Sequence, residues 1–180
     1  MRTLALVFLS FALVSCSNSS QTTNNATASA PEANVKNEVI WYEDDMSKPI
    51  KNVGLGDAKV ILQNADVKPA EIVDSTDVKG EPKKIYIYSK NGIHGQFEYS
   101  PNQAILAWYQ VTESPSAIES SQDSLKTTYR LARAILGEEG KEAIRRISRG
   151  GMFKGEPVAG YPAHGSCVNG LCILSLKTRI

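Results

Sequence analysis

Residues 83–111, KKIYIYSKNGIHGQFEYSPNQAILAWYQV, constrain the fold of this chain more than any other stretch. Asn91-Gly92 is the residue pair that a two-residue type I′ hairpin turn requires, and residues 100–103, SPNQ, are typical of a second tight turn. Three antiparallel strands joined by these two turns are therefore predicted.

The turns also predict the register and give the three strands one aromatic face. Cross-strand partners share a face, so Tyr86 pairs with Phe97 and Tyr88 with Gly95. If Tyr99 pairs with Ala104, the whole face consists of Tyr86, Tyr88, Ile93, Phe97, Tyr99, Leu106 and Trp108. The reverse face carries His94, Gln96 and Glu98 on the middle strand. Such an aromatic face requires a cover, which the rest of the domain must provide.

Residues 116–149 supply that cover as one or two amphipathic helices. Ser116 and Glu119 fit a capping box at a helix start. Apolar residues then recur on one helical face, at Ile118, Leu125, Tyr129, Ala132 and Leu136. Gly137 ends or kinks this helix, and residues 138–149 are again helical with Ile144 and Ile147 inward. The predicted fold class is α+β: an antiparallel sheet of about five to seven strands, with residues 83–111 at its centre and the helices on one face.

The first sixteen residues resemble the signal peptide and lipobox of bacterial lipoproteins. Arg2 precedes an apolar run at residues 4–13 that is too short to span a bilayer, and Leu13-Val14-Ser15-Cys16 follows. The resemblance implies cleavage before Cys16 and lipids on that cysteine, which would anchor the protein to a membrane. Ser17 is not the Asp that tends to retain such proteins at the inner membrane, so the outer membrane is expected in a Gram-negative host. A secretory signal with an unrelated cysteine is the alternative.

The chain therefore divides into a signal peptide at 1–15, a lipidated cysteine and disordered tether at 16–37, and one globular α+β domain at 38–180. The tether is small and polar, without aromatic residues. The domain is predicted to begin with a strand at residues 39–42, anchored by Trp41. Residues 54–57, GLGD, are interpreted as a turn into a strand at 59–62, and residues 63–82 as irregular or short-stranded.

The C-terminal part is predicted to be a long glycine-rich loop followed by a stapled hairpin. Residues 150–170 hold six glycines and two prolines, and such loops are usually functional or disordered. If this loop is functional, the side chains that it offers to a partner are Met152, Phe153, Tyr161, His164 and Asn169. The alternative is a plain surface connection whose aromatic residues pack beneath it. Asn169-Gly170 is a second hairpin turn, flanked symmetrically by Cys167 and Cys172. These two cysteines are within disulfide range across such a hairpin, and Cys16 is assigned to lipid, so a Cys167–Cys172 disulfide is predicted.

Charge is balanced overall but unevenly distributed. The formal net charge is +1. Residues 37–82 contain five lysines and ten acidic residues, whereas residues 120–180 contain ten basic and five acidic residues. One interpretation is that the acidic and basic parts face each other within one fold. The other is that the basic part forms an anion-binding surface. Lys126, Arg130 and Arg133 form a stripe on one helical face of that surface. The absence of a long basic run argues against nucleic acid as a partner.

No catalytic or metal-binding constellation can be assembled from the sequence. His164 precedes Cys167 by three residues, but a disulfide would remove the thiolate that a cell-wall cysteine peptidase needs. Neither zinc-ligand spacing nor a serine nucleophile motif is present, and no metal or cofactor is expected. The preferred hypothesis is a lipid-anchored envelope protein that binds an envelope partner. The alternatives are an inhibitor of a cell-wall-active enzyme, by analogy with the disulfide-closed loop of periplasmic lysozyme inhibitors, and a cell-wall hydrolase.

Overall fold

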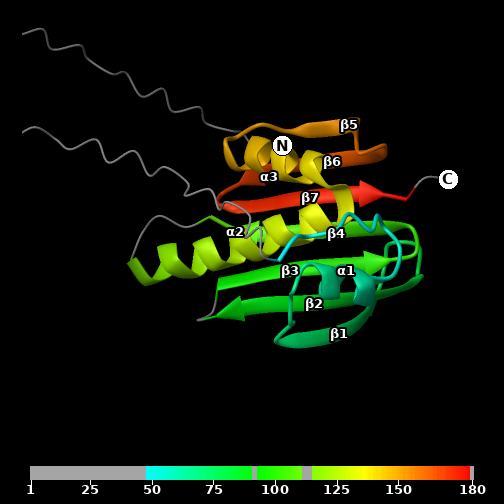
Figure 1. Ribbon diagram of the computed structural model, residues 1–180, viewed down its shortest axis with the longest axis horizontal. Helices are drawn as coiled ribbons and strands as arrows, with labels where there is room; N and C mark the ends of the chain where they lie inside the picture. Colours follow the sequence, from blue (N-terminus) through cyan, green and yellow to red (C-terminus); the bar gives the residue numbers. More distant parts are fainter. Residues whose placement is uncertain (1–47, 91–92, 111–114, 179–180) are drawn as a thin grey trace, which may run out of the picture. The chain divides into compact units, whose positions relative to one another are not determined.

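One seven-stranded antiparallel sheet and three helices make up the described part of the domain. The computed structural model describes residues 48–90, 93–110 and 115–178. The strand order is β1-β2-β3-β4-β7-β6-β5, with β4 in the middle (Figure 1). The elements are, in chain order, α1 (Ala58–Asn64), β1 (Glu71–Thr76), β2 (Pro82–Lys90), β3 (Ile93–Ser100), β4 (Gln103–Tyr109), α2 (Pro115–Leu136), α3 (Glu138–Ser148), β5 (Phe153–Val158), β6 (Tyr161–Val168) and β7 (Leu171–Lys177).

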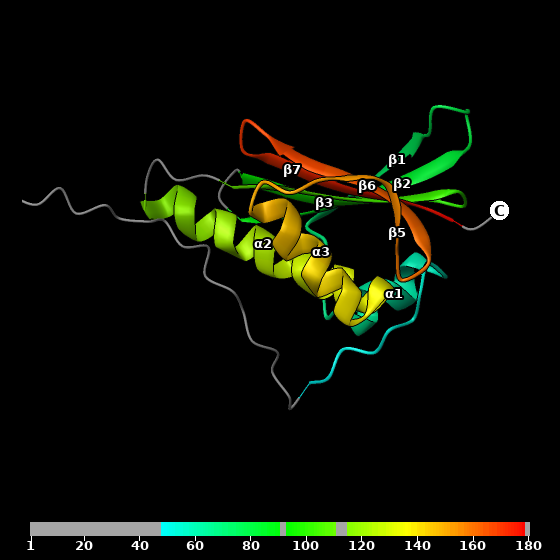
Figure 2. The same ribbon diagram turned by 90° about the horizontal axis from the view of Figure 1, so that it is seen from above.

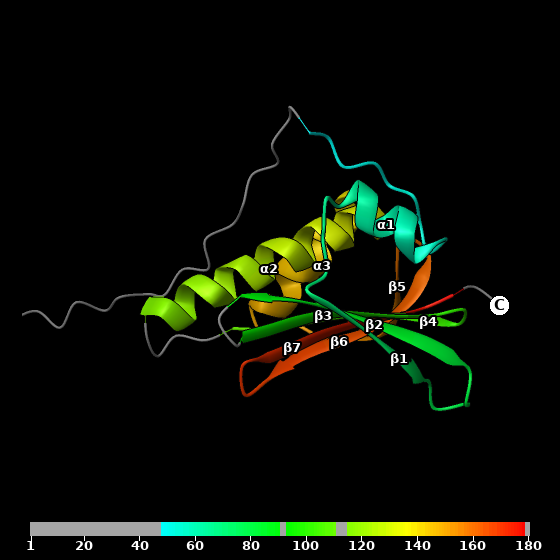
Figure 3. The same cartoon turned by 90° about the horizontal axis from the view of Figure 1, so that it is seen from below.

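All three helices lie on the same side of the sheet (Figures 2 and 3). α2 packs on β2, β3 and β4, whereas α3 packs on β5, β6 and β7. The predicted α+β class, with helices on one face of an antiparallel sheet, is confirmed. Among the described helices, none combines the length and the apolar composition needed to cross a membrane.

The central meander has the predicted register. Tyr86 pairs with Phe97, Tyr88 with Gly95 and Tyr99 with Ala104, as the turn chemistry indicates. The face that these residues share is buried beneath the helices and includes Tyr86, Tyr88, Phe97, Leu106 and Trp108. The Asn91-Gly92 turn and the side chains of Ile93 and His94 lie outside the described part of the chain, as do residues 39–42.

The apolar stripe predicted for residues 118–136 lies in the core. Leu125, Tyr129, Ala132 and Leu136 are buried, while Ile118 is half-buried. α2 begins at Pro115, so Ser116 lies in the first turn and is not the capping residue. Gly137 has a φ of 66°, a conformation that favours glycine, and this residue separates α2 from α3. Ile144 and Ile147 are fully buried, as predicted.

The strand predicted at residues 59–62 is wrong, because these residues belong to helix α1. Asp57 caps this helix by accepting a hydrogen bond from the Lys59 backbone N–H at 2.7 Å. Ile61 and Leu62 then face the core from one turn of helix. A short apolar run such as Val60-Ile61-Leu62 does not by itself distinguish a strand from a helix. The region predicted to be irregular or short-stranded, residues 63–82, contains the short edge strand β1, as this prediction allowed.

The loop predicted at residues 150–170 is also wrong, because most of it forms β5 and β6. Gly155 has a φ of 110° within an irregular pairing between residues 154 and 157, and Gly160 occupies the turn between the strands. Phe153, Val158 and Ala163 are buried. Glycine and proline at the bulge and turn conceal the apolar alternation by which strands are recognised in a sequence.

Gly165 is where α3 lies closest to β6. A Cβ atom at this position would lie 2.6 Å from Ile147 Cδ1 and 2.7 Å from the Ile173 carbonyl oxygen. We expect Gly165→Ala to lower the free energy of unfolding by about 1–3 kcal/mol, because a methyl group would push the helix from the sheet. Urea unfolding measures this change. Ser166→Ala, on the opposite face of the same strand, should change it by less than about 0.5 kcal/mol. Equal effects of the two variants would contradict this packing.

Candidate functional site

The aromatic residues predicted to contact a partner are instead part of the packing. Phe153 is buried, and the Arg146 guanidinium lies 4.2 Å from its ring centroid. Tyr161 is half-buried, and its hydroxyl accepts a hydrogen bond from the Leu55 backbone N–H at 3.3 Å. Of the two alternatives for these side chains, packing within the domain agrees with the structure, and presentation to a partner does not.

His164 and Cys167 lie on opposite faces of β6. The pairing of β6 with β7 is regular from Ala163 to Val168, so side chains alternate between the faces throughout. His164 is exposed and pairs with Ser175, whereas the Cys167 sulfur faces the core, 3.3 Å from the Ile147 carbonyl oxygen. This arrangement does not bring the imidazole and the sulfur together.

Cys167 and Cys172 are cross-strand partners and are joined as a disulfide, with their Cα atoms 4.0 Å apart. Asn169 and Gly170 both have positive φ, which is the conformation of the predicted type I′ turn. The turn does not project freely, because the Gln110 backbone N–H donates to the Gly170 carbonyl oxygen at 2.7 Å. Asn169 is exposed at the tip, and Val168 beside it is 65% exposed.

Two members of the predicted basic stripe connect neighbouring helices. Arg130 donates from Nε to the Ala65 carbonyl oxygen at 2.6 Å, at the end of α1, and its side chain is 20% exposed. Arg133 forms an ion pair with Glu138 at the start of α3, and its side chain is 14% exposed. Only Lys126 has an exposed position, at the edge of a cavity of about 240 Å³ that Lys68 and Asp123 also line. The stripe is therefore not the open anion-binding surface that the sequence suggested.

The positive residues of α3 are likewise close to acids. Arg145 pairs with Glu142 at 3.0 Å, and Arg146 pairs with Glu156 at 2.8 Å. The Lys154 backbone N–H donates to Glu156, and this bond together with Arg146 lowers the pKa of the Glu156 carboxyl. These contacts tie α3 to β5 and neutralise much of the predicted positive surface.

A hollow lies beside α1, where α2 and α3 do not cover the sheet. It is a groove of about 610 Å³ between α1 and the ends of β1, β2 and β3. Its lining consists of Asp57, Ala58, Lys59, Asp74, Ser75, Pro82, Lys83, Lys84, Tyr86, Tyr99, Ser100 and Pro101. We call this hollow the α1 groove. It combines a largely apolar lining with a few polar groups, which is the usual character of a binding site.

Tyrosine side chains line the sheet side of the α1 groove. Tyr86 stacks on Phe97 with ring centroids 5.7 Å apart, and Phe97 lies 6.0 Å from Tyr99. The Tyr99 hydroxyl donates a hydrogen bond to the Gly56 carbonyl oxygen, which fixes the segment that leads into α1. Burial raises the pKa of both Tyr86 and Tyr99, so both phenols are neutral at physiological pH.

Charges of both signs surround this aromatic lining. Lys84 Nζ lies 2.5 Å from Asp74 Oδ1, across β1 and β2, in a pair that is largely exposed. Asp57 and Lys59 belong to the first turn of α1 on the other side. The α1 groove thus offers apolar surface and balanced charge. Among the described residues no three His, Cys, Asp or Glu side chains are grouped so that they could hold a metal ion.

Sequence reasoning missed this site because it depends on α1. A strand at 59–62 would have placed Asp57 and Lys59 in another geometry, and no motif joins these residues to Tyr86 and Tyr99, which follow much later. The only local signal was Asp57 followed by a short apolar run, the pattern of a capped helix.

Comparison with known proteins gives no match: no family model, no curated protein and no solved structure is similar to this chain.

The disulfide leads to a prediction for the oxidised and reduced protein. Closing so short a loop should stabilise the domain by about 2 kcal/mol, chiefly by restricting the unfolded chain. Reduction should therefore lower the urea midpoint and leave the far-ultraviolet circular dichroism unchanged. Alkylation followed by mass measurement supplies the control, because Cys167 and Cys172 should react only after reduction. Labelling of either cysteine before reduction would contradict the pairing.

Buried tyrosines lead to a prediction for high pH. Tyr88 is buried, and its hydroxyl lies 2.9 Å from Thr128 Oγ1; burial raises the Tyr88 pKa. In the unfolded chain the same phenol ionises near pH 10. The folded state then holds more protons above pH 10, so the free energy of unfolding should fall as the pH rises further. Urea unfolding at a series of alkaline pH values measures this free energy. Tyr88→Phe should reduce the slope of the free energy of unfolding against pH. An unchanged slope would contradict the raised pKa of Tyr88.

Proposed function

We propose that this protein is a lipid-anchored protein of the bacterial cell envelope that acts by binding, with the α1 groove as its ligand site. The lipobox-like sequence ending at Cys16 supports the anchor. The polar segment at residues 17–37 would act as a tether of roughly 25 Å average span. The observation that carries the proposal is the groove of about 610 Å³, with its tyrosine lining and charged rim.

The chemistry of the α1 groove favours a short segment of an envelope protein as the ligand. An apolar side chain of such a segment can pack on Tyr86 and Tyr99. Asp74 and Lys84 on one side, with Asp57 and Lys59 on the other, provide partners for charges of either sign. A strongly charged ligand such as a nucleic acid would instead require one dominant sign.

Binding is a better account of these residues than catalysis. The one histidine–cysteine pair that suggested a nucleophile has its members on opposite faces of β6. The α1 groove contains no histidine or cysteine that could act as nucleophile or base with its carboxylates. Inhibition of a cell-wall-active enzyme is the second candidate, and exposed Val168 at the tip of the stapled hairpin is the feature that favours it.

Site-specific photo-crosslinking in the producing cells tests the proposal. A photoreactive residue at Lys59, on the rim of the α1 groove, should yield a discrete product with one envelope protein. Tyr99→Ala should reduce that product by at least about fivefold, because it removes part of the lining and the bond to Gly56. The matched control is the same photoreactive residue at Glu119, which is exposed on α2 away from the groove.

The outcomes separate the two candidate functions. Equal products from Lys59 and Glu119, or no effect of Tyr99→Ala, would contradict binding in the α1 groove. Protection of cells from a muramidase that is lost in Val168→Asp but kept in Tyr99→Ala would favour inhibition by the hairpin instead.

A further inference from the structure

The sheet face opposite the helices is unusually apolar for a surface in water. We call it the outer face. The strand pairings place nine apolar residues on it: Val73, Ile85, Ile87, Ile105, Ala107, Tyr109, Val168, Leu171 and Ile173. They form two groups, one on β1 and β2 and one on β4, β7 and β6, with β3 between the groups. The outward-facing residues of β3 are polar. No described helix covers this face (Figures 2 and 3).

An antiparallel sheet with one face in water normally alternates apolar residues inward with polar residues outward. β4 does not follow this rule, because Ile105, Ala107 and Tyr109 face outward while Leu106 and Trp108 face the core. Tyr109 and Val168 remain 38% and 65% exposed. Contiguous exposed apolar surface of this kind marks an interaction site more often than a free surface.

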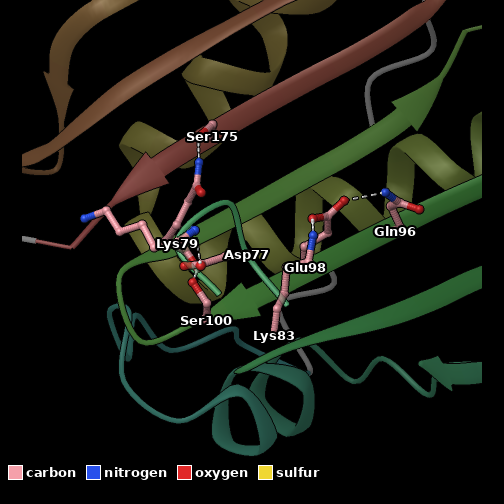
Figure 4. A network of polar contacts seen from close by, with 8 residues as sticks. Asp77, Lys79, Lys83, Gln96, Glu98, Ser100 and Ser175 are labelled. Atoms are coloured by element: carbon pink, nitrogen blue, oxygen red, sulfur yellow. Dashed lines mark hydrogen bonds and ion pairs between the residues drawn. The ribbon is translucent and has the colours of Figure 1, made fainter. Parts of the chain in front are cut away.

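Several polar groups near the middle of the outer face have partners within the face. Lys83 Nζ donates to Glu98 Oε2 at 2.7 Å, and Gln96 Nε2 donates to Glu98 Oε1 at 2.7 Å (Figure 4). Beside them, Gln103 Nε2 donates to Ser175 Oγ at 2.7 Å. The Lys83 and Glu98 side chains are only 20% and 14% exposed. A covering surface would therefore not leave these charges without a partner, which is the main cost of burying them.

We propose that a second copy of this chain covers the outer face, so that the two sheets pack face to face as a two-fold dimer. Seven strands spaced ~4.8 Å apart, over ~20 Å of strand length, give ~700 Å² for each copy. The two copies together would bury ~1,400 Å², within the range of stable protein interfaces. Packing of two sheets about 10 Å apart is a common arrangement.

The charges at the margins of the outer face favour a second copy in one orientation. Glu71 lies on β1 at one edge, whereas Lys154 on β5 and Lys177 on β7 lie on the other side of β4. A two-fold axis parallel to β4 places the β1 edge of one copy over the β5 edge of the other. Glu71 then faces the β5 edge that carries Lys154, and each β4 side chain faces its own counterpart. An axis across the strands would place Glu71 near Glu71 and is disfavoured.

The tyrosine lining of the α1 groove, Tyr86 and Tyr99, is on the helix side of the sheet, so a ligand there and the dimer can coexist. Lys83 belongs to both surfaces. The dimer does not depend on the proposed function, and each can fail separately.

Cysteine crosslinking of the full-length protein in its own membrane tests the dimer. Ile105→Cys places a thiol on β4 close to the two-fold axis, and mild oxidation should give a covalent dimer of twice the monomer mass. Glu119→Cys, exposed on α2 on the helix side, is the matched control and should remain monomeric. A product of Ile105→Cys with a different protein, or no product, would overturn the proposal.

Charge exchange tests the orientation in purified, detergent-solubilised protein. Glu71→Lys should weaken dimerisation about fivefold to tenfold, because each dimer contains the contact twice. Adding Lys154→Glu to this variant should restore dimerisation. Ile105→Asp should weaken it more than a hundredfold while the thermal unfolding transition is retained, since Ile105 is not in the core. Analytical ultracentrifugation measures all three. A monomeric wild-type protein, or a dimer that none of these changes affects, would contradict the proposal.

Discussion

The packing of α2 and α3 on one face of the sheet is the constraint on which the rest of this structure depends. Trp108, Leu106 and Phe97 are fully buried beneath α2, and Ile144 and Ile147 bury α3 against the strands of the other half. Because both helices lie on the same side, the opposite face receives no cover from the described chain. Because neither α2 nor α3 covers the ends of β1, β2 and β3 beside α1, the α1 groove remains between the sheet and α1. Both proposed binding surfaces follow from this one-sided cover.

The charged residues serve mainly to join elements. Arg130 joins α2 to α1, Arg133 joins α2 to α3, and Arg146 joins α3 to β5. The acidic N-terminal part and the basic C-terminal part meet where α2 packs on α1, with Arg130 3.9 Å from Asp66, whereas their strands lie on either side of β4. Part of this uneven charge distribution is neutralised by the ion pairs that join the helices to their neighbours. On the outer face the uneven distribution remains, and there a two-fold partner would bring opposite charges together.

The fold could be predicted from sequence where turn chemistry and periodicity agreed. Asn169-Gly170 and the turn at Pro101-Asn102 determined two hairpins, and the register followed from strand alternation. Prediction failed at α1, where Val60-Ile61-Leu62 is too short to show a helical period and Asp57 was taken for part of a turn. It failed again at β5 and β6, where Gly155 at an irregular pairing interrupts the alternation.

The candidate site was harder to predict than the fold, because its residues are distant in sequence. The α1 groove joins Asp57 and Lys59 to Tyr86 and Tyr99 only through tertiary packing. Phe153 and Tyr161 were predicted to contact a partner because aromatic residues in a glycine-rich loop suggest exposure, yet each packs within a strand. Arg130 and Arg133 were likewise predicted to form a basic stripe from their helical spacing. Such spacing shows that residues share a helical face, but it does not show which elements pack beside that face.

Hydroxyl-radical footprinting tests most directly the central claim that the outer face is apolar and is covered by a second copy in the functioning protein. The protein would be labelled in intact envelopes and, separately, after purification at high dilution. We expect Tyr109, Leu171 and Ile173 to be oxidised in the dilute protein and protected in the envelope, while buried Trp108 and Phe97 react in neither. Equal oxidation of the outer-face residues in both samples would contradict the account.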